Sequence, residues 1–299
     1  MTSSPRKAGA VLSLGRIYCD LVFRGLGGMP QLGRELFARD FAMTPGGGAL
    51  ITAAHLSASG RSSALLSRFG TDALSQALAG QIEALGIDLR FLDRHDSAGP
   101  QLTVVMVNHN DRAFLSRRAG HARPSSFERA LAWPEARHLH IAEYATLHEM
   151  RDAIAAAKAN GLTVSLDPSW DDELIRDPLF FERTAGIDVF LPNQEEAYAL
   201  TGTEDPRGAL AVLGRHFPVV ALKCGGDGAL LAMDGAVIAL PSPKVEVVDT
   251  TGAGDAFNAG FLDAWLDSAG PAECLSAAIT AGSRSVQASG GTGSLAASA

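Results

Sequence analysis

The sequence predicts an α/β fold with a mostly parallel sheet and helices on both of its faces. Short apolar or β-branched runs alternate along the chain with longer segments rich in alanine and leucine, and this alternation is typical of βαβ units. The 299 residues are 46% hydrophobic and 19% charged, which suits a compact globular chain and excludes a disordered or coiled-coil one. We expect a single domain over residues 8–295.

The alternation predicts each element in order. The expected strands lie at residues 11–14, 64–67, 138–141, 164–167, 189–191 and 219–222. The expected helices lie at residues 49–59, 74–85, 149–160 and 208–217. A hairpin through 225–228 then leads to a further strand at 245–249. Residues 271–287 should form the last helix, and the tail rich in Gly, Ser and Ala should be a loop.

Two regions interrupt this rhythm, at residues 21–44 and 101–118. In the second region, two β-prone runs flank the turn-like residues 109–111, as they would in a hairpin. We expect both regions to form a small β lid over one edge of the core.

Composition excludes several partners. The net charge is −8 and no block of Lys and Arg is long enough to follow a phosphate backbone, so we expect no nucleic-acid partner. No run approaches the roughly 18 apolar residues of a membrane span, so we expect no membrane partner. Cys19, Cys224 and Cys274 have no CxxC spacing, which indicates neither disulfides nor zinc and favours a cytoplasmic location. His138 and His140 alternate along an expected strand, where packing is a better interpretation than metal binding.

The segment VVDTTGAGDAFNAGF at residues 247–261 has the pattern of a phosphate-binding turn followed by a helix. Gly252 and Gly254 allow successive backbone N–H groups to converge on one anion, and a helix that starts there adds its positive N-terminal end. Asp255 could then take the proton from a hydroxyl that attacks a bound phosphate. The alternative is that Asp255 only caps the helix.

Other motifs are absent from the chain. GxxxxGK[ST] does not occur, and Gly252-Ala253-Gly254 lacks the third glycine of a dinucleotide fingerprint. HExxH and GxSxG do not occur either, so the two hydrolase classes that are easiest to detect are excluded.

The residues 249–257, DTTGAGDAF, resemble the C-terminal signature of the ribokinase-like (PfkB) family of carbohydrate kinases. The likeness extends over nearly the whole chain in the order of the family's motifs, at residues 15–20, 45–60, 69–72, 86–88, 111–114, 191–196 and 222–225. The resemblance implies a three-layer sandwich with a mostly parallel sheet and a small β lid.

For activity, the resemblance implies that the γ-phosphate of ATP is transferred to a hydroxyl of a small sugar or sugar acid in the presence of Mg²⁺. Asp255 would be the general base, and Gly252, Ala253 and Gly254 would form the anion hole. A nucleoside kinase is an alternative, and so is a catalytically silent protein that binds a sugar or nucleoside. A homodimer formed through the lid is common in the family, and the apolar Phe41 and Met43 would permit one.

The resemblance also assigns the cofactor sites. The nucleotide-binding residues would be Asn193, Lys223, Gly225, Gly228 and Thr280. Asn193 and Glu196 are three residues apart, which suits holding Mg²⁺ through water, although an ordinary N-cap with a first-turn acid has the same spacing. Asp249 and the 288–291 loop are candidates for a monovalent cation such as K⁺.

For the acceptor, the resemblance implies contacts from Asp20, from the backbone of Gly46 and Gly47, and from Arg112 in the lid. Ile51 stands where many family members carry an Asn that binds the sugar. An isoleucine cannot make that hydrogen bond, so the pattern indicates either a more apolar acceptor face or another residue in this role.

Overall fold

The computed structural model describes residues 7–108 and 111–296, whose centre is an eight-stranded sheet in the order β14-β13-β12-β11-β10-β9-β1-β4. The strands from β4 to β12 pair in parallel, and β13 and β14 continue the sheet antiparallel. The bounds are β1 Lys7–Leu14, β4 Arg61–Leu66, β9 Ala136–Ile141, β10 Thr163–Leu166, β11 Val189–Phe190, β12 Val219–Lys223, β13 Ala229–Met233 and β14 Ala236–Leu240.

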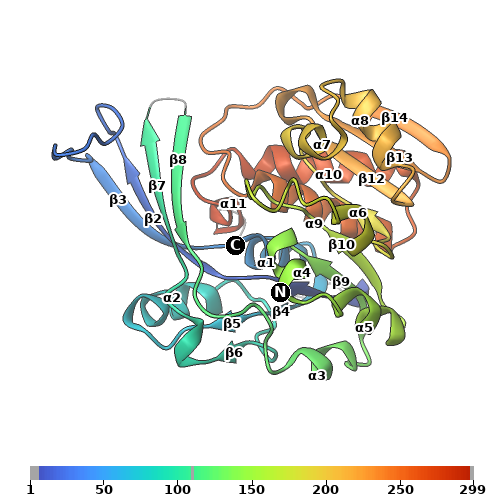
Figure 1. Ribbon diagram of the computed structural model, residues 1–299, viewed down its shortest axis with the longest axis horizontal. Coiled ribbons are helices and arrows are strands. Elements are labelled where there is room, and N and C mark those ends of the chain that lie inside the picture. Colours follow the sequence, from blue (N-terminus) through green and yellow to red (C-terminus); the bar gives the residue numbers. More distant parts are fainter. Residues whose placement is uncertain (1–6, 109–110, 297–299) are drawn as a thin grey trace, which may run out of the picture.

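Helices cover both faces of this sheet and produce three layers, as Figure 1 shows. Within the described residues, none of these helices is both long and apolar enough to cross a membrane. Their bounds are α1 Gly48–Ala58, α2 Ala73–Glu83, α3 Phe127–Leu131, α4 Tyr144–Glu149, α5 Ala153–Ala159, α6 Phe180–Arg183, α7 Gln194–Thr201, α8 Pro206–Leu213, α9 Ala253–Leu266, α10 Pro271–Ser285 and α11 Gly293–Ala296.

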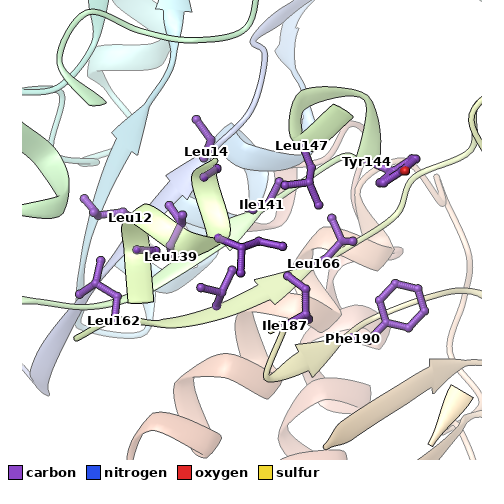
Figure 2. Packing of buried hydrophobic residues seen from close by; sticks show 14 of the residues in the cluster. Leu12, Leu14, Leu139, Ile141, Tyr144, Leu147, Leu162, Leu166, Ile187 and Phe190 are labelled. Atoms are coloured by element: carbon purple, nitrogen blue, oxygen red, sulfur yellow. The ribbon is translucent and has the colours of Figure 1, made fainter. Parts of the chain in front are cut away.

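The parallel strands are largely buried because helices cover both of their faces. On one face, Ile141 packs beside Leu147 of α4, and Leu12 and Leu139 belong to the same apolar cluster (Figure 2). On the other face, Phe257 and Phe261 of α9 pack on strand residues. This packing holds α9 along the sheet.

A second sheet has the order β3-β2-β7-β8 and projects from the body of the molecule (Figure 1). Its strands are β2 Tyr18–Arg24, β3 Asp40–Gly46, β7 Leu102–Asn108 and β8 Asp111–Arg117. Both regions that interrupt the α/β rhythm therefore contribute strands to this sheet. A small parallel pair, β5 Arg68–Phe69 and β6 Asp93–Arg94, and two 3₁₀ turns, Asp96–Ala98 and Gly225–Asp227, complete the elements.

Three local predictions are wrong. Residues 245–249 are not a strand, because β13 and β14 already complete this edge of the sheet; Val248 and Asp249 instead donate backbone hydrogen bonds to the Val286 oxygen. The expected helix at 149–160 is interrupted after Glu149, where α4 ends, and resumes as α5. The tail forms the short helix α11 and is not only a loop.

Candidate active site

Helix α9 begins where the anion-binding loop was expected. Its N-cap is Gly252, with a φ of 73°, and a Cβ at this position would lie 2.5 Å from the Gly291 Cα. Only glycine fits both the left-handed backbone and this close approach. Asp255 is the third residue of the helix, so the alternative in which it serves as the N-cap is wrong.

A cavity of about 280 Å³ opens at this helix terminus. It lies beyond the carboxyl ends of β1, β9, β10 and β12, where open α/β sheets collect their ligands. The expected site residues in its lining are Gly47, Asn193, Glu196, Lys223, Gly252, Gly254 and Asp255. The fold thus brings together segments of the chain that are up to about two hundred residues apart.

Asp255 lines this cavity, and its carboxyl group has a raised pKa. Burial raises the pKa of its carboxyl group to about 7, and the negative charges of Asp167 and Asp20 raise it further than Lys223 lowers it. A Cβ on Gly48 would lie 2.9 Å from Asp255 Oδ1, so glycine leaves the carboxylate accessible. A carboxyl group with a pKa near neutrality suits proton transfer at physiological pH.

Lys223 belongs to a network that the sequence analysis did not include. Its Nζ donates to Asp167 Oδ2 at 2.6 Å, and Asn258 Nδ2 donates to the same oxygen at 2.6 Å. Burial lowers the pKa of Lys223, but Asp167 and Glu196 raise it above its ordinary value, so the ammonium stays charged. Lys223 lies beside Gly254, with Nζ 3.5 Å from where a Cβ would be.

Asn193 and Glu196 form a capping box at the start of α7. Asn193 Oδ1 accepts from the Glu196 N–H at 2.9 Å, and Glu196 Oε2 accepts from the Asn193 N–H at 2.8 Å. The capping interpretation of this pair is therefore confirmed. Both side chains also line the cavity, where burial and the charge of Asp167 raise the pKa of Glu196 to about 7.

The oxygen atoms at this position suit a hard cation. Asn193, Glu196 and Asp167 line the cavity with amide and carboxylate oxygens, the ligand type that Mg²⁺ prefers when it keeps part of its water shell. Among the described residues, no group of three or more His, Cys, Asp or Glu side chains is arranged to hold a metal ion.

A second cavity of about 450 Å³ adjoins the first, and Lys223 and Gly254 line both. Gly225 and Gly228 lie at its rim as expected, and its walls are mostly apolar, with Val245, Val247, Phe257, Ile279 and Val286. Thr280 does not line this cavity: it is exposed, and its hydroxyl donates to the Ser276 oxygen. Helix α10 presents Ile279, Gly282, Ser283 and Val286 on one face, and Thr280 points away from that face.

On the acceptor side, Asp20 of β2 lies against the turn between β3 and α1. A Cβ on Gly46 would lie 2.0 Å from Asp20 Oδ2, and one on Gly47, whose φ is 103°, would lie 2.3 Å from the Arg16 oxygen. Burial raises the pKa of Asp20 to about 7. Glycine at position 46 therefore lets the chain approach Asp20 of β2, and glycine at position 47 lets it approach the Arg16 carbonyl, which precedes β2.

Four expected acceptor residues, Asp20, Gly46, Ile51 and Arg112, are not in the lining of the cavity. Ile51 is buried beneath the anion-binding loop, where its side chain packs against Gly252 and Gly291. Arg112 pairs with Val107 in the second sheet, and its side chain lies outside the described residues.

A family profile with the description pfkB family carbohydrate kinase matches residues 14–297. The chain belongs to the PfkB family. This PfkB protein is therefore a phosphotransferase with an alcohol group as acceptor, a sugar or nucleoside kinase in the broad sense.

Individual relatives of this PfkB kinase agree. The ATP-dependent ribose-1-phosphate kinase of Halopiger xanaduensis is 28% identical over 263 residues, which cover 86% of this chain and 84% of the relative. The ribokinase of Lactococcus lactis is 26% identical over 291 residues, which cover 94% and 92%. The solved structure of Arabidopsis thaliana ribokinase complexed with ribose and ATP matches with a TM-score of 0.82 at 23% identity, over 95% of this chain and 94% of that one. The predicted ribokinase-like fold is confirmed.

In this PfkB kinase, Asp249 connects two loops behind the anion-binding turn. Its Oδ1 accepts from the Thr251 N–H at 2.9 Å, and its Oδ2 accepts from the Gly290 N–H at 3.0 Å.

Away from this site, the side chains of His138 and His140 are buried in the sheet, and a ring nitrogen of each lies within hydrogen-bond distance of the Ser165 hydroxyl.

The sequence analysis missed several polar residues of the site. A signal was present for some of them: Asp167 ends an expected strand, and Asn258 is one helical turn after Asp255. Arg16 and Glu143, which line the same cavity, carried the same signal as Asp167 because they follow the expected strands at 11–14 and 138–141, whereas no comparable signal marked Tyr18.

Proposed function

We propose that this PfkB kinase transfers the γ-phosphate of ATP to a hydroxyl of a small sugar or sugar acid, with Asp255 as the general base. One observation carries the proposal. The partly buried Asp255 carboxylate lies in the first turn of α9, in a cavity that joins a second, mostly apolar cavity at Lys223 and Gly254. The acceptor would occupy the first cavity and the nucleotide base the second.

In the proposed reaction, Asp255 accepts the proton of the acceptor hydroxyl as its oxygen bonds to the γ-phosphorus. The bond from that phosphorus to the β,γ-bridging oxygen breaks, and ADP leaves. The backbone N–H groups at residues 252–254 would stabilise the charge on the transferred group, with help from the positive end of α9. Lys223, held by Asp167, would neutralise phosphate charge at the junction of the cavities.

Mg²⁺ would be held through water by Asn193 and Glu196, and it would neutralise charge on the nucleotide phosphates. Asp249 and the 288–291 loop as a K⁺ site stay a prediction from the resemblance. Asp20 and the Gly46–Gly47 turn would bind acceptor hydroxyls. A nucleoside acceptor is the second candidate, because Tyr18 brings an aromatic ring to the cavity lining.

We also propose that two copies associate through the second sheet, which would act as the lid. Phe23, Phe41, Val104 and Met106 of this sheet line an apolar cavity of about 470 Å³, and Phe41 is 53% exposed. Such a surface favours a protein partner.

The three cysteines are free and buried, which supports a reducing, cytoplasmic location.

The decisive test is ADP release with MgATP across pentoses, hexoses, sugar acids and nucleosides, with Asp255→Asn beside the parent. We expect one acceptor class to give turnover that Asp255→Asn lowers by roughly 10²–10⁴, the scale of a lost general base. Circular dichroism would check that the variant is folded. Unchanged turnover in the variant would remove Asp255 from the mechanism, and binding of acceptors without any turnover would favour a silent binding protein.

A further inference from the structure

Helix α1 lies against the start of α9 (Figure 1). Its residues Ile51, Thr52 and His55 share one side of the helix, because they lie within about one turn of each other. Thr52 is fully buried, and its hydroxyl donates to the backbone oxygen of Asp255 at 3.3 Å. His55 is half-buried, and its Nε2 lies 2.9 Å from the Gly291 oxygen. Helix α1 therefore has polar contacts on both sides of the anion-binding turn.

The hydrogen bond of His55 has one possible direction. The Gly291 oxygen is a carbonyl oxygen and can only accept, so His55 Nε2 must carry the proton. The neutral tautomer with this proton and the imidazolium both meet this condition. The contact therefore does not depend on the charge of His55.

Gly291 is packed between α1 and the anion-binding turn. A Cβ on Gly252, the N-cap of α9, would lie 2.5 Å from the Gly291 Cα. A Cβ on Gly291 would lie 2.5 Å from Ile51 Cδ1. Ile51 thus supports Gly291 by packing, while His55 holds its carbonyl group. Because the two glycines are in such close contact, the position of Gly291 limits the position of Gly252.

The position of Gly252 matters for the proposed reaction. Backbone N–H groups stabilise a developing charge best when they are already fixed in place before the reaction, since no reorganisation is then needed. Helix α1 starts directly after the Gly46–Gly47 turn, which would bind the acceptor, and carries His55 near its other end. One helix thus connects the proposed acceptor turn with the support of the anion-binding turn.

We propose that His55 is a positioning residue for phosphoryl transfer: through Gly291 it holds the turn at 252–254 in the geometry that stabilises the transferred group. Ile51 supports the same glycine by packing. This inference rests on the proposed function, because it takes this turn as the anion hole. His55 lines neither the first nor the second cavity, so it acts through Gly291 and not by touching the acceptor or the nucleotide.

The first experiment compares turnover of His55→Leu, His55→Gln and the parent at saturating MgATP, with excess KCl so that the predicted K⁺ site does not limit the rate. His55→Leu should lower kcat by about tenfold, less than the roughly 10²–10³ for a lost anion-hole donor, because the N–H groups remain but are held less firmly. The KM values for acceptor and ATP should change little. His55→Gln should recover most of the loss, because its amide can still donate to the Gly291 oxygen.

His216→Leu is the matched control. His216 is exposed, stacks on Phe181 and lies outside the linings of both cavities, so this variant should keep the kcat of the parent. A parent-like kcat in His55→Leu would overturn the proposal, and so would an equal loss in His55→Leu and His55→Gln. A loss confined to the KM for the acceptor would also overturn it, because His55 would then act on acceptor binding.

Binding of a phosphoryl mimic gives a readout that does not depend on turnover. Calorimetry would measure the affinity for MgADP with and without aluminium fluoride, which imitates the phosphoryl group in transit. His55→Leu should bind MgADP like the parent but lose about tenfold of the extra affinity that aluminium fluoride provides. A merely structural defect would weaken both kinds of binding. A parent that gains no affinity from aluminium fluoride would overturn the inference, because its turn would hold no phosphoryl group.

The same measurement separates this inference from the proposed function. If Asp255→Asn keeps its turnover but His55→Leu still loses the fluoride-dependent affinity, Asp255 is not the base and the role of His55 stands. If turnover depends on Asp255 but His55→Leu keeps its kcat and its fluoride-dependent affinity, the role of His55 is wrong and the proposed function stands.

Discussion

At the scale of single residues, the carboxyl group of Asp255 combines its proposed catalytic use with a cost in stability. It lies where the acceptor and the phosphoryl group would meet in the proposed reaction, and desolvation raises its pKa to about 7. A carboxyl group that is held near neutrality can accept a proton, but its ionised form is disfavoured in the folded state. Both consequences can be measured.

The pH dependence of turnover should report the ionised form of Asp255. We expect kcat/KM to rise about tenfold per pH unit below pH 7 and to level off above it, because only the carboxylate can act as the base. A profile that is flat from pH 5 to 8 would contradict this role.

The stability of Asp255→Asn should also depend on pH. The pKa of Asp255 is higher in the folded chain than the ordinary 3.8, so its contribution to stability is present below that value and is lost as the pH rises to about 7. Asp255→Asn should therefore unfold at a higher temperature than the parent at pH 8, with a smaller difference at pH 5. Glu195→Gln is the control, because it neutralises an exposed carboxylate. Its unfolding temperature relative to the parent should not change between pH 5 and pH 8. A variant less stable than the parent at pH 8 would show that the buried charge is compensated.

At the scale of elements, the first turn of α7 has two uses. Glu196 caps the helix through Oε2, and its side chain also lines the cavity. A glutamine at this position could still accept from the Asn193 N–H, so the cap and the metal role can be separated by one substitution.

Glu196→Gln should raise the Mg²⁺ concentration needed for half-maximal turnover by several-fold, because it removes one negative charge from the proposed cation site. Titration of turnover with Mg²⁺ would measure this, with Glu195→Gln on the same turn as the control. Identical titration curves for Glu196→Gln and the parent would leave Glu196 with only its capping role.

At the scale of the whole molecule, Arg61 connects the far end of α9 to the start of the sheet. Its side chain is 0% exposed; Nε lies 2.6 Å from Asp263 Oδ1, Nη2 lies 2.5 Å from Asp267 Oδ1, and Nη1 donates to the Ala8 oxygen at 2.7 Å. Since Asp255 is on the same helix, this network helps to hold Asp255, the proposed base, in its place.

Arg61→Met should destabilise the fold by about 1.5–3 kcal/mol, because it removes the buried hydrogen bonds to Asp263 and Asp267, while Lys7 still pairs with Asp263 at 2.6 Å. Denaturant unfolding would measure the loss. Arg123→Met is the control: Arg123 pairs with Glu128 and Asp152 nearer the surface, and its loss should cost at most about 1 kcal/mol. Equal unfolding midpoints for the two variants would show that the buried network contributes little.

The proposed association of two copies also belongs to this scale. Phe41→Asp should convert a dimer to a monomer in sedimentation experiments, because it places a charge on the apolar face of the second sheet. Val237→Asp alters a similarly exposed apolar residue on β14 and should leave the mass unchanged. A parent that sediments as a monomer, or a Phe41→Asp variant that keeps the dimer mass, would contradict this proposal.

The sequence by itself determined the α/β class, the positions of the six parallel strands along the chain and the glycine-containing turn before α9. These features depend on local periodicity and on glycines at adjacent positions, which are readable along the chain. The capping pair of α7 was readable for the same reason, because its residues are three apart.

Only the tertiary structure decided which side chains share the cavity. It placed Arg16, Glu143 and Asp167, from three different strand ends, around Asp255, and it buried Ile51 and exposed Thr280 against expectation. The physical reason is that a side chain's direction is set by its helix or strand face, and its neighbours are set by strand order. Burial and the charges of distant residues then set the pKa of Asp255, and no local stretch of sequence records either of them.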